Sequence, residues 1–416
     1  MPLACISHHT RAVAARWDAL SGLRPVGPLE RVSTVPARPA TVRARHTAAS
    51  KRPTASRAEA SGPAAALPPW VRLLTLIAAT WLVPWAQTHG SPRPDDHRPL
   101  RPVHTYSIVA RDPDSGEMGV AVQSHWFAVG SRVAWAEAGV GVVATQSFIE
   151  VRYGASGLDL MRSGWTAPQA LAALLEADPH PEVRQVAMID ARGEVAVHTG
   201  AQCIRYAGDL TGEGLAVQAN LMLRPGVEAA MAQAYRETTG ALAERLLVAL
   251  EAAQAAGGDL RGRQAASLVV VRARSTGRPW EDRIVDLHVE DHPTPVKELR
   301  RLYRLQTAYE HMDRGDRAIE SGDVAGALSE YGAAEALAPE NLEMRFWHAV
   351  SLVNARRLDE ALPLFAGVFA RDLHWRTLVG RLHEAGLLSG DAAVVRRIES
   401  VQPLRPHPPL QDSSHP

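Results

Sequence analysis

The chain has 416 residues, which is enough for two or three domains of roughly 150 residues each. Hydrophobic residues make up 46% and charged residues 22%, as in ordinary globular proteins. The 45 basic and 45 acidic side chains cancel, which argues against a nucleic-acid-binding surface. Cys5 and Cys203 are the only cysteines, so a disulfide framework and a cysteine-rich zinc site are excluded.

The N-terminal part differs from the rest in composition. Residues 1–70 are rich in Arg, Pro, Ala and Ser and poor in acids, so we expect a disordered extension. Two alternatives stay open: a targeting peptide, and a later start of translation that leaves this segment unmade. Residues 71–90 contain an apolar run that is shorter than the roughly 20 residues of a bilayer span. We expect a signal peptide and an exported, periplasmic or extracellular protein, with a membrane anchor or a cytoplasmic protein as the alternatives.

A proline-rich linker is predicted at 91–103, followed by a main domain at 104–292. Its apolar and alternating patterns predict strands at 105–110, 118–124, 139–146, 186–190, 194–198, 215–220, 266–271 and 284–289. Helices are predicted at 157–162, 167–177, 226–237 and 240–255, and Thr166 is the expected N-cap of the second. Two groups of strands separated by a helical pair predict an α+β domain with two sheets covered by helices.

The remainder, 293–390, is predicted to be all-helical and contains a repeat of period 34. Ala327 and Tyr331 recur as Ala361 and Phe365, and Gly315 recurs as Ala349. Ala334 and Pro339 complete the first unit, but the second unit has Val368 and Leu373 in their places. Small residues at a helix crossing followed by an aromatic residue resemble the tetratricopeptide pattern. Two units fall below the usual minimum of three, so we expect a helix at 295–311 or 376–388 to cap them, or packing on the main domain. Residues 391–416 are predicted to be a mostly disordered tail.

The start of the main domain carries the polar residues that could do chemistry. Thr105 opens the first predicted strand, Ser124 and His125 end the second, and Thr145, Gln146 and Ser147 end the third. A threonine hydroxyl can attack a carbonyl while its own freed α-amine acts as the base. We therefore predict Thr105 as the nucleophile. The remaining predicted residues line the pocket or the oxyanion position: Ser124, His125, Glu137, Thr145, Gln146 and Ser147.

Each of these residues also has a purely structural interpretation. Thr105 suits a strand because it is β-branched, and Glu137 suits either a buried acid or a surface charge. Ser124 and His125 are neighbours on a strand and point to opposite faces, so only one of them is expected at the site. Asp190 and Asp259 are expected in turns or caps. Cys203 is expected to be a small buried residue, because nothing basic lies beside it.

The main domain resembles the bacterial domain-of-unknown-function family 1028. The resemblance is carried by residues 105–112, 119–130, 136–147 and 152–160, and it extends to 182–187, 198–204 and 256–266. The family is classed with the N-terminal nucleophile hydrolases, which implies a four-layer αββα fold and an amide hydrolase. Its members often begin Met-Thr, and that threonine corresponds to Thr105. Here Thr105 is internal, so a free α-amine requires a cut after His104. Lys297 is the only lysine outside the N-terminal extension, so Arg132 or His125 is expected to tune the site.

The sequence therefore predicts an exported hydrolase of a small amide, with no assigned substrate. The alternative is a non-catalytic member of the fold that binds a small ligand, with a helical repeat that docks a peptide or protein. A third hypothesis makes the repeat the functional part and the main domain its scaffold. No metal, cofactor or nucleic acid is indicated, and a homo-oligomer stays open.

Overall fold

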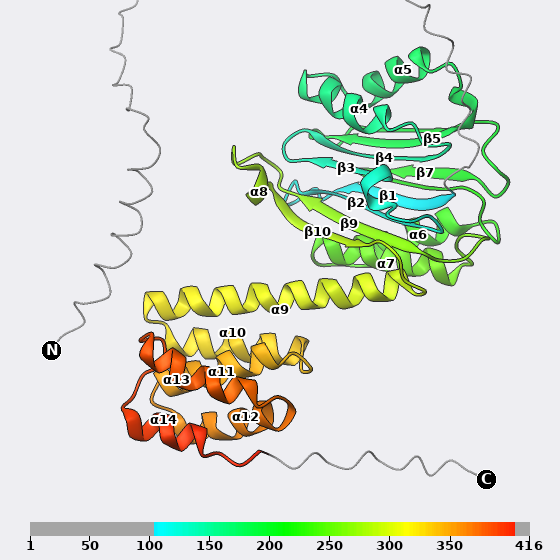
Figure 1. Cartoon of the computed structure of the whole chain (residues 1–416). Coiled ribbons are helices and arrows are strands. Elements are labelled where there is room, and N and C mark those ends of the chain that lie inside the picture. Colours follow the sequence, from blue (N-terminus) through cyan, green and yellow to red (C-terminus); the bar gives the residue numbers. More distant parts are fainter. Residues whose placement is uncertain (1–103, 404–416) are drawn as a thin grey trace, which may run out of the picture. The chain divides into compact units, whose positions relative to one another are not determined.

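A computed structural model describes residues 104–403 (Figure 1). The extension at 1–70, the signal peptide or anchor at 71–90, the linker at 91–103 and the last part of the tail lie outside the described residues. Two antiparallel sheets with helices are followed by a helical region, so the α+β class is confirmed. Between residues 104 and 403, no helix combines the length and the apolar character that crossing a membrane requires.

The larger sheet has six strands in the order β10-β9-β2-β1-β8-β7. Their bounds are β1 Thr105–Arg111, β2 Met118–Ser124, β7 Gly208–Gly212, β8 Leu215–Ala219, β9 Ala265–Val271 and β10 Arg283–Val289. β1 lies in the interior of the sheet between β2 and β8, and Thr105 is paired with Ser124. The turn between β1 and β2 forms because Asp112 accepts hydrogen bonds from the amides of Asp114 and Ser115.

The smaller sheet has four strands in the order β3-β4-β5-β6. They are β3 Ala134–Glu137, β4 Gly141–Ser147, β5 Arg184–Asp190 and β6 Val195–Thr199. β5 and β6 pair as a hairpin, and the expectation that Asp190 lies in a turn is confirmed, because Asp190 accepts the amides of Arg192 and Glu194 there. The sequence prediction missed β3 and β7. Both are short, partly exposed edge strands, so neither shows the buried apolar run that reveals a strand.

The two sheets pack face to face through apolar side chains such as Val109, Val120, Val142 and Ile189. Helices α4 (Arg152–Arg162) and α5 (Ala167–Ala177) pack on the outer face of the smaller sheet. Helices α6 (Val227–Glu237) and α7 (Leu242–Ala255) pack on the outer face of the larger one (Figure 1). Short helical turns occur at α3 (Gly130–Val133), η1 (Pro181–Val183) and α8 (Pro279–Asp282). Each sheet is covered by the other sheet on one face and by helices on the other. Its central strands are therefore buried on both faces, which explains their nearly continuous apolar sequences.

The helical region begins inside the main domain. Helix α9 is continuous from Pro295 to Ser321, and its first turns bury Val296 and Leu299 in the core formed by α7 and the larger sheet. Its second half packs Ala308 and Met312 against α10 (Val324–Leu337). The predicted boundary between 292 and 293 therefore separates segments that share one core. A cap limited to 295–311 does not exist, because the same helix continues into the first repeat.

The 34-residue repeat corresponds to antiparallel helix pairs. Ala327, Tyr331, Ala361 and Phe365 are buried, and a Cβ on Gly315 would lie 2.7 Å from the Tyr331 ring. The second pair is α11 (Leu342–Asn354) and α12 (Leu358–Arg371), followed by α13 (His374–Glu384) and α14 (Ala392–Glu399).

Helix α14 corrects the prediction of a mostly disordered tail at 391–416. Asp391 caps this helix by accepting the amides of Ala393 and Val394. Val395 and Ile398 are buried in the core that α11, α12 and α13 share. The cap and the spacing of the two apolar residues together stabilise a third helix pair.

Candidate functional site

Thr105 is fully buried at the first position of β1, on the face of the larger sheet that packs against the smaller one. Its carbonyl oxygen accepts hydrogen bonds from Gln146 Nε2 at 3.1 Å and from the backbone amide of Asn220 at 3.1 Å. Ser107, two residues further along the same face, donates to Gln146 Oε1 at 2.7 Å. Gln146 thus links the strand of the smaller sheet to the start of β1.

The peptide group before Thr105 is held by two donors. The carbonyl oxygen of His104 accepts from Ser124 Oγ at 2.5 Å and from Arg261 Nη2 at 2.8 Å. The His104 side chain is itself buried and lies 3.0 Å from Asn220 Oδ1 through Nδ1. Burial lowers the pKa of His104 below its ordinary value, so the imidazole is neutral near pH 7.

Arg261 is fixed in place by a buried carboxylate. Asp259 accepts from Arg261 Nε at 3.1 Å and from Nη2 at 2.7 Å, and it also accepts the backbone amide of His125 at 3.1 Å. A two-point pair of this kind sets the orientation of a guanidinium group. The sequence analysis assigned Asp259 to a turn or cap and did not consider Arg261. The only signal was an Asp-x-Arg sequence between Gly258 and Gly262, which a glycine-rich turn also explains.

A network of buried side-chain amides supports these groups. Gln185 Oε1 accepts from Gln146 Nε2 at 2.7 Å and from Asn220 Nδ2 at 2.8 Å. Gln185 Nε2 donates to Thr199 Oγ1 at 2.9 Å and to two backbone carbonyls. Gln218 Nε2 donates to Ser107 Oγ at 3.2 Å. The sequence analysis missed Gln185, Gln218 and Asn220, because each lies in or directly beside a predicted strand and belongs to no local motif.

The structure places the other predicted site residues as follows. The His125 side chain is exposed, and it is Ser124 that turns toward His104. Thr145 Oγ1 donates to the carbonyl of Glu150 at 3.2 Å, which holds the loop after β4. Ser147 is buried at the end of β4. Glu137 is not part of the site: it is paired with Gly141 at the opposite end of β4 and forms an ion pair with Arg162.

Backbone strain is concentrated around this end of the two sheets. Four residues other than glycine have positive φ angles here: Ser147 (68°) at the end of β4, and Ala128 (52°), Tyr206 (59°) and Leu221 (53°) in the loops after β2, β6 and β8. Such conformations cost about 1–3 kcal/mol each and often occur at functional sites. Among residues 104–403, the other such residue is Arg356 in the helical region.

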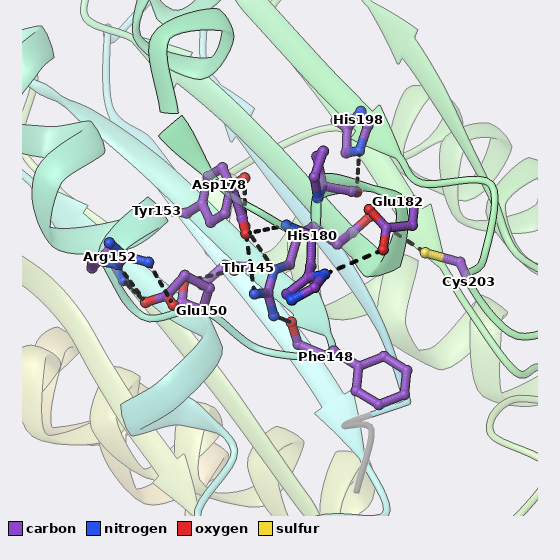
Figure 2. Close-up of polar contacts among 12 residues, drawn as sticks. Thr145, Phe148, Glu150, Arg152, Tyr153, Asp178, His180, Glu182, His198 and Cys203 are labelled. Atoms are coloured by element: carbon purple, nitrogen blue, oxygen red, sulfur yellow. Dashed lines mark hydrogen bonds and ion pairs between the residues drawn. The ribbon is translucent and has the colours of Figure 1, made fainter. Parts of the chain in front are cut away.

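A second polar cluster holds the loops after β4 and before β5 (Figure 2). Asp178 and Arg184 form a buried ion pair at 2.7 Å, and the Tyr153 hydroxyl donates to Asp178 at 3.0 Å. Arg184 Nη1 donates to the Phe148 carbonyl at 2.6 Å. The Cys203 thiol donates to the Arg184 carbonyl at 3.3 Å, and burial raises the pKa of this thiol. Cys203 is therefore a protonated, partly buried residue rather than a nucleophile.

Comparison with known proteins agrees with the resemblance noted above. Residues 105–299 match the model of a family of unknown function, DUF1028. Among solved structures, the chain is similar to protein SPO2555 from Silicibacter pomeroyi, whose crystal structure carries the same family description. The two are 28% identical, and the match covers 49% of this chain and 89% of the other, with a TM-score of 0.45. A search of the curated proteins finds no match. The family match ends within α9, whose first turns pack into the core of the main domain.

Proposed function

We propose that the domain at 105–299 is an N-terminal-nucleophile-type hydrolase that cleaves a small amide C–N bond, with Thr105 as the nucleophile. Two facing sheets with helices on both outer faces are compatible with the αββα arrangement that the family resemblance implies. Thr105 is the first residue of an interior strand and lies on the inner face of its sheet.

The observation that carries the proposal is the pair of donors on the His104 carbonyl. Ser124 Oγ and Arg261 Nη2 both contact this oxygen, and such donors stabilise the oxyanion that forms when a carbonyl is attacked. In the proposed maturation step, Thr105 Oγ bonds to the His104 carbonyl carbon, the C–N bond breaks, and the hydroxyl proton passes to the leaving nitrogen. Water then hydrolyses the ester, which restores the hydroxyl and leaves a free α-amine on Thr105.

In the mature enzyme, a substrate carbonyl would occupy the position that the His104 carbonyl vacates. Ser124 and Arg261 would then stabilise its oxyanion, and the α-amine of Thr105 would accept the hydroxyl proton. The nearby fixed cation is Arg261, not the Arg132 or His125 expected from the sequence. A neighbouring positive charge favours the neutral, basic form of an amine, which is the form a general base needs.

A second candidate is a non-catalytic domain that binds a small ligand. It is favoured by the position of His104, whose side chain is buried and lies 3.0 Å from Asn220 Oδ1. For either candidate we propose export directed by residues 71–90. We further propose that the helix pairs form a tetratricopeptide-type stack that docks a peptide or protein.

Intact-mass measurement and N-terminal sequencing of the full chain, recovered from its native host, test the hydrolase proposal. We expect a chain that begins at Thr105, and no cleavage there in Thr105→Ala. Ser124→Ala and Arg261→Ala should each slow cleavage by about 10²-fold or more, since one oxyanion donor contributes roughly that factor. Ser131→Ala and Arg132→Ala, at exposed positions on α3, are the matched controls.

A wild-type chain in which Thr105 stays internal would overturn the hydrolase proposal and favour ligand binding. Circular dichroism on each variant separates lost processing from lost folding. If cleavage at Thr105 is observed, the next experiment is a screen of small amides. It compares the processed wild type with the processed Ser124→Ala variant. Release of an amine that depends on Ser124 would show the same donors acting on substrate.

A further inference from the structure

A cleft of about 500 Å³ lies in the helical region, between the first half of α9 and the connection from α10 to α11. One wall is formed by α9 residues from Lys297 to Leu305, and the other by residues 337–341. The two walls belong to one packed unit, because Leu305 and Ala338 both contact the core formed by α9, α10 and α11. We refer to this feature as the α9 cleft.

The α9 cleft carries an excess of positive charge. Lys297, Arg301 and Arg304 follow one another at i, i+4 and i+7, so they share one face of the helix. Lys297 and Arg304 form no ion pair with any residue between 104 and 403, and Arg301 pairs only with Glu298. The Arg301 side chain is 60% exposed in this pair, and ion pairs at the surface contribute little, so Arg301 can be redirected to a ligand.

The other two charged residues at the α9 cleft each have an ion-pair partner. Arg300 is held by Glu251 at 2.9 Å and by Glu244, both on α7. Glu340 is the one acid that lines the cleft in the described part of the chain, and it pairs with Arg371 at 2.7 Å. That pair is exposed and neutralises Glu340 little, but Lys297, Arg301 and Arg304 still outnumber this single acid around a ligand-sized space.

The rest of the lining is apolar. Leu305 on α9 faces the cleft together with Leu337 and Pro339 from the opposite wall, and the Leu337 side chain is 37% exposed. An apolar wall beside cations fits an apolar side chain flanked by carboxylates. Single-stranded nucleic acid is disfavoured, because bases bind on aromatic platforms and the described lining contains no aromatic residue.

We propose that the α9 cleft is a docking site for an acidic peptide segment. An apolar side chain of the peptide packs on Leu305, Leu337 and Pro339, and its carboxylates pair with Lys297, Arg301 and Arg304. This inference rests on the peptide docking proposed above for the helix pairs and names the class of peptide. The site is separate from Thr105, and its occupation does not depend on the proposed hydrolase activity.

Fluorescence anisotropy with the full chain tests the proposal, using a labelled Glu-Glu-Leu-Glu-Glu peptide with both ends blocked. We expect binding that weakens with added salt, and a loss of about tenfold or more in Arg304→Glu and in Lys297→Glu. Arg317→Glu is the matched control: Arg317 is an exposed arginine of the same helix, outside the cleft and without an ion pair in the described chain. It should bind the peptide like the wild type.

Three comparisons can overturn the proposal. Equal binding of the Gln-Gln-Leu-Gln-Gln peptide would show that the carboxylates are not recognised. An equal loss in Arg317→Glu and Arg304→Glu would show a response to overall charge rather than to the cleft. Binding of an oligothymidylate in preference to the acidic peptide would assign the cleft to nucleic acid instead. Because Arg304 forms no ion pair, thermal melting of Arg304→Glu should match the wild type, so a loss of binding cannot be ascribed to unfolding.

Discussion

The layer between the two sheets has two ends of opposite character. At one end, Val109, Val120, Val142 and Ile189 fill the space with apolar side chains. At the other, the same strands or the residues that follow them supply amides and hydroxyls: Ser107, Gln146, Gln185, Gln218 and Asn220. Both ends are fully buried. Burying an amide is costly unless it is hydrogen-bonded, whereas burying a valine is favourable by itself.

The difference between the two ends indicates that the polar end fixes the geometry of the backbone. An apolar core needs the right volume, but a buried amide network needs each partner in one geometry. Here the bonds of Gln146 and Asn220 converge on Thr105 and His104, so the network fixes the backbone at which the two residues meet. We infer that positioning the start of β1, rather than packing, explains why these strands bury amides.

The largest effect on stability is expected at the ion pair behind this polar end. Asp178→Ala would leave Arg184 buried and uncompensated, which typically costs about 3–5 kcal/mol. Urea unfolding of the wild type and the variant measures the difference in the free energy of unfolding. A change below about 1 kcal/mol would mean that Arg184 finds other partners, and the role assigned to this pair would be lost.

The same pair predicts a pH dependence. Burial acts to raise the pKa of Asp178, but hydrogen bonds from Arg184 and the His180 amide outweigh it and leave the pKa lowered. A lowered carboxyl pKa stabilises the folded state above the unfolded-state value, and this contribution is lost as pH falls through the folded-state value. Asp178→Asn should therefore lose less stability than the wild type between neutral and acid pH.

A smaller effect is expected within the amide network. Gln185→Leu keeps roughly the volume but removes the oxygen that accepts from Gln146 Nε2 and Asn220 Nδ2, at a cost of about 2–3 kcal/mol. Ile189→Val on the same strand, at the apolar end, should cost only about 1 kcal/mol. Processing at Thr105 should fall in Gln185→Leu and persist in Ile189→Val. If the two variants are processed equally well, the polar end of the layer between the sheets has no special role in processing.

The smallest effect is expected at Glu137. Its ion pair with Arg162 is partly exposed, so Glu137→Ala should change the free energy of unfolding by less than about 1 kcal/mol. Added salt should shrink that difference further, because it screens the charges. Processing at Thr105 should be unchanged, since Glu137 lies at the far end of β4. A strong loss of processing in this variant would show that Glu137 does contribute to the site.

Local patterns in the sequence determined much of the main domain. Apolar runs revealed the buried strands, and the Thr166 N-cap and the turn at Asp190 formed where they were expected. Each depends on residues only a few positions apart. The repeat residues Ala327 and Tyr331 were likewise predictable from helical spacing.

Only the tertiary structure decided which polar residues meet. Arg261 reaches the carbonyl of His104 across 157 positions of sequence, and Gln185 joins Asn220 from the other sheet. The register of strands far apart in the chain brings these groups together, and no local period encodes that register. The same holds for α14 and for the start of α9, whose apolar residues are buried by partners elsewhere in the chain. Local propensity sets the elements, whereas long-range packing sets the site.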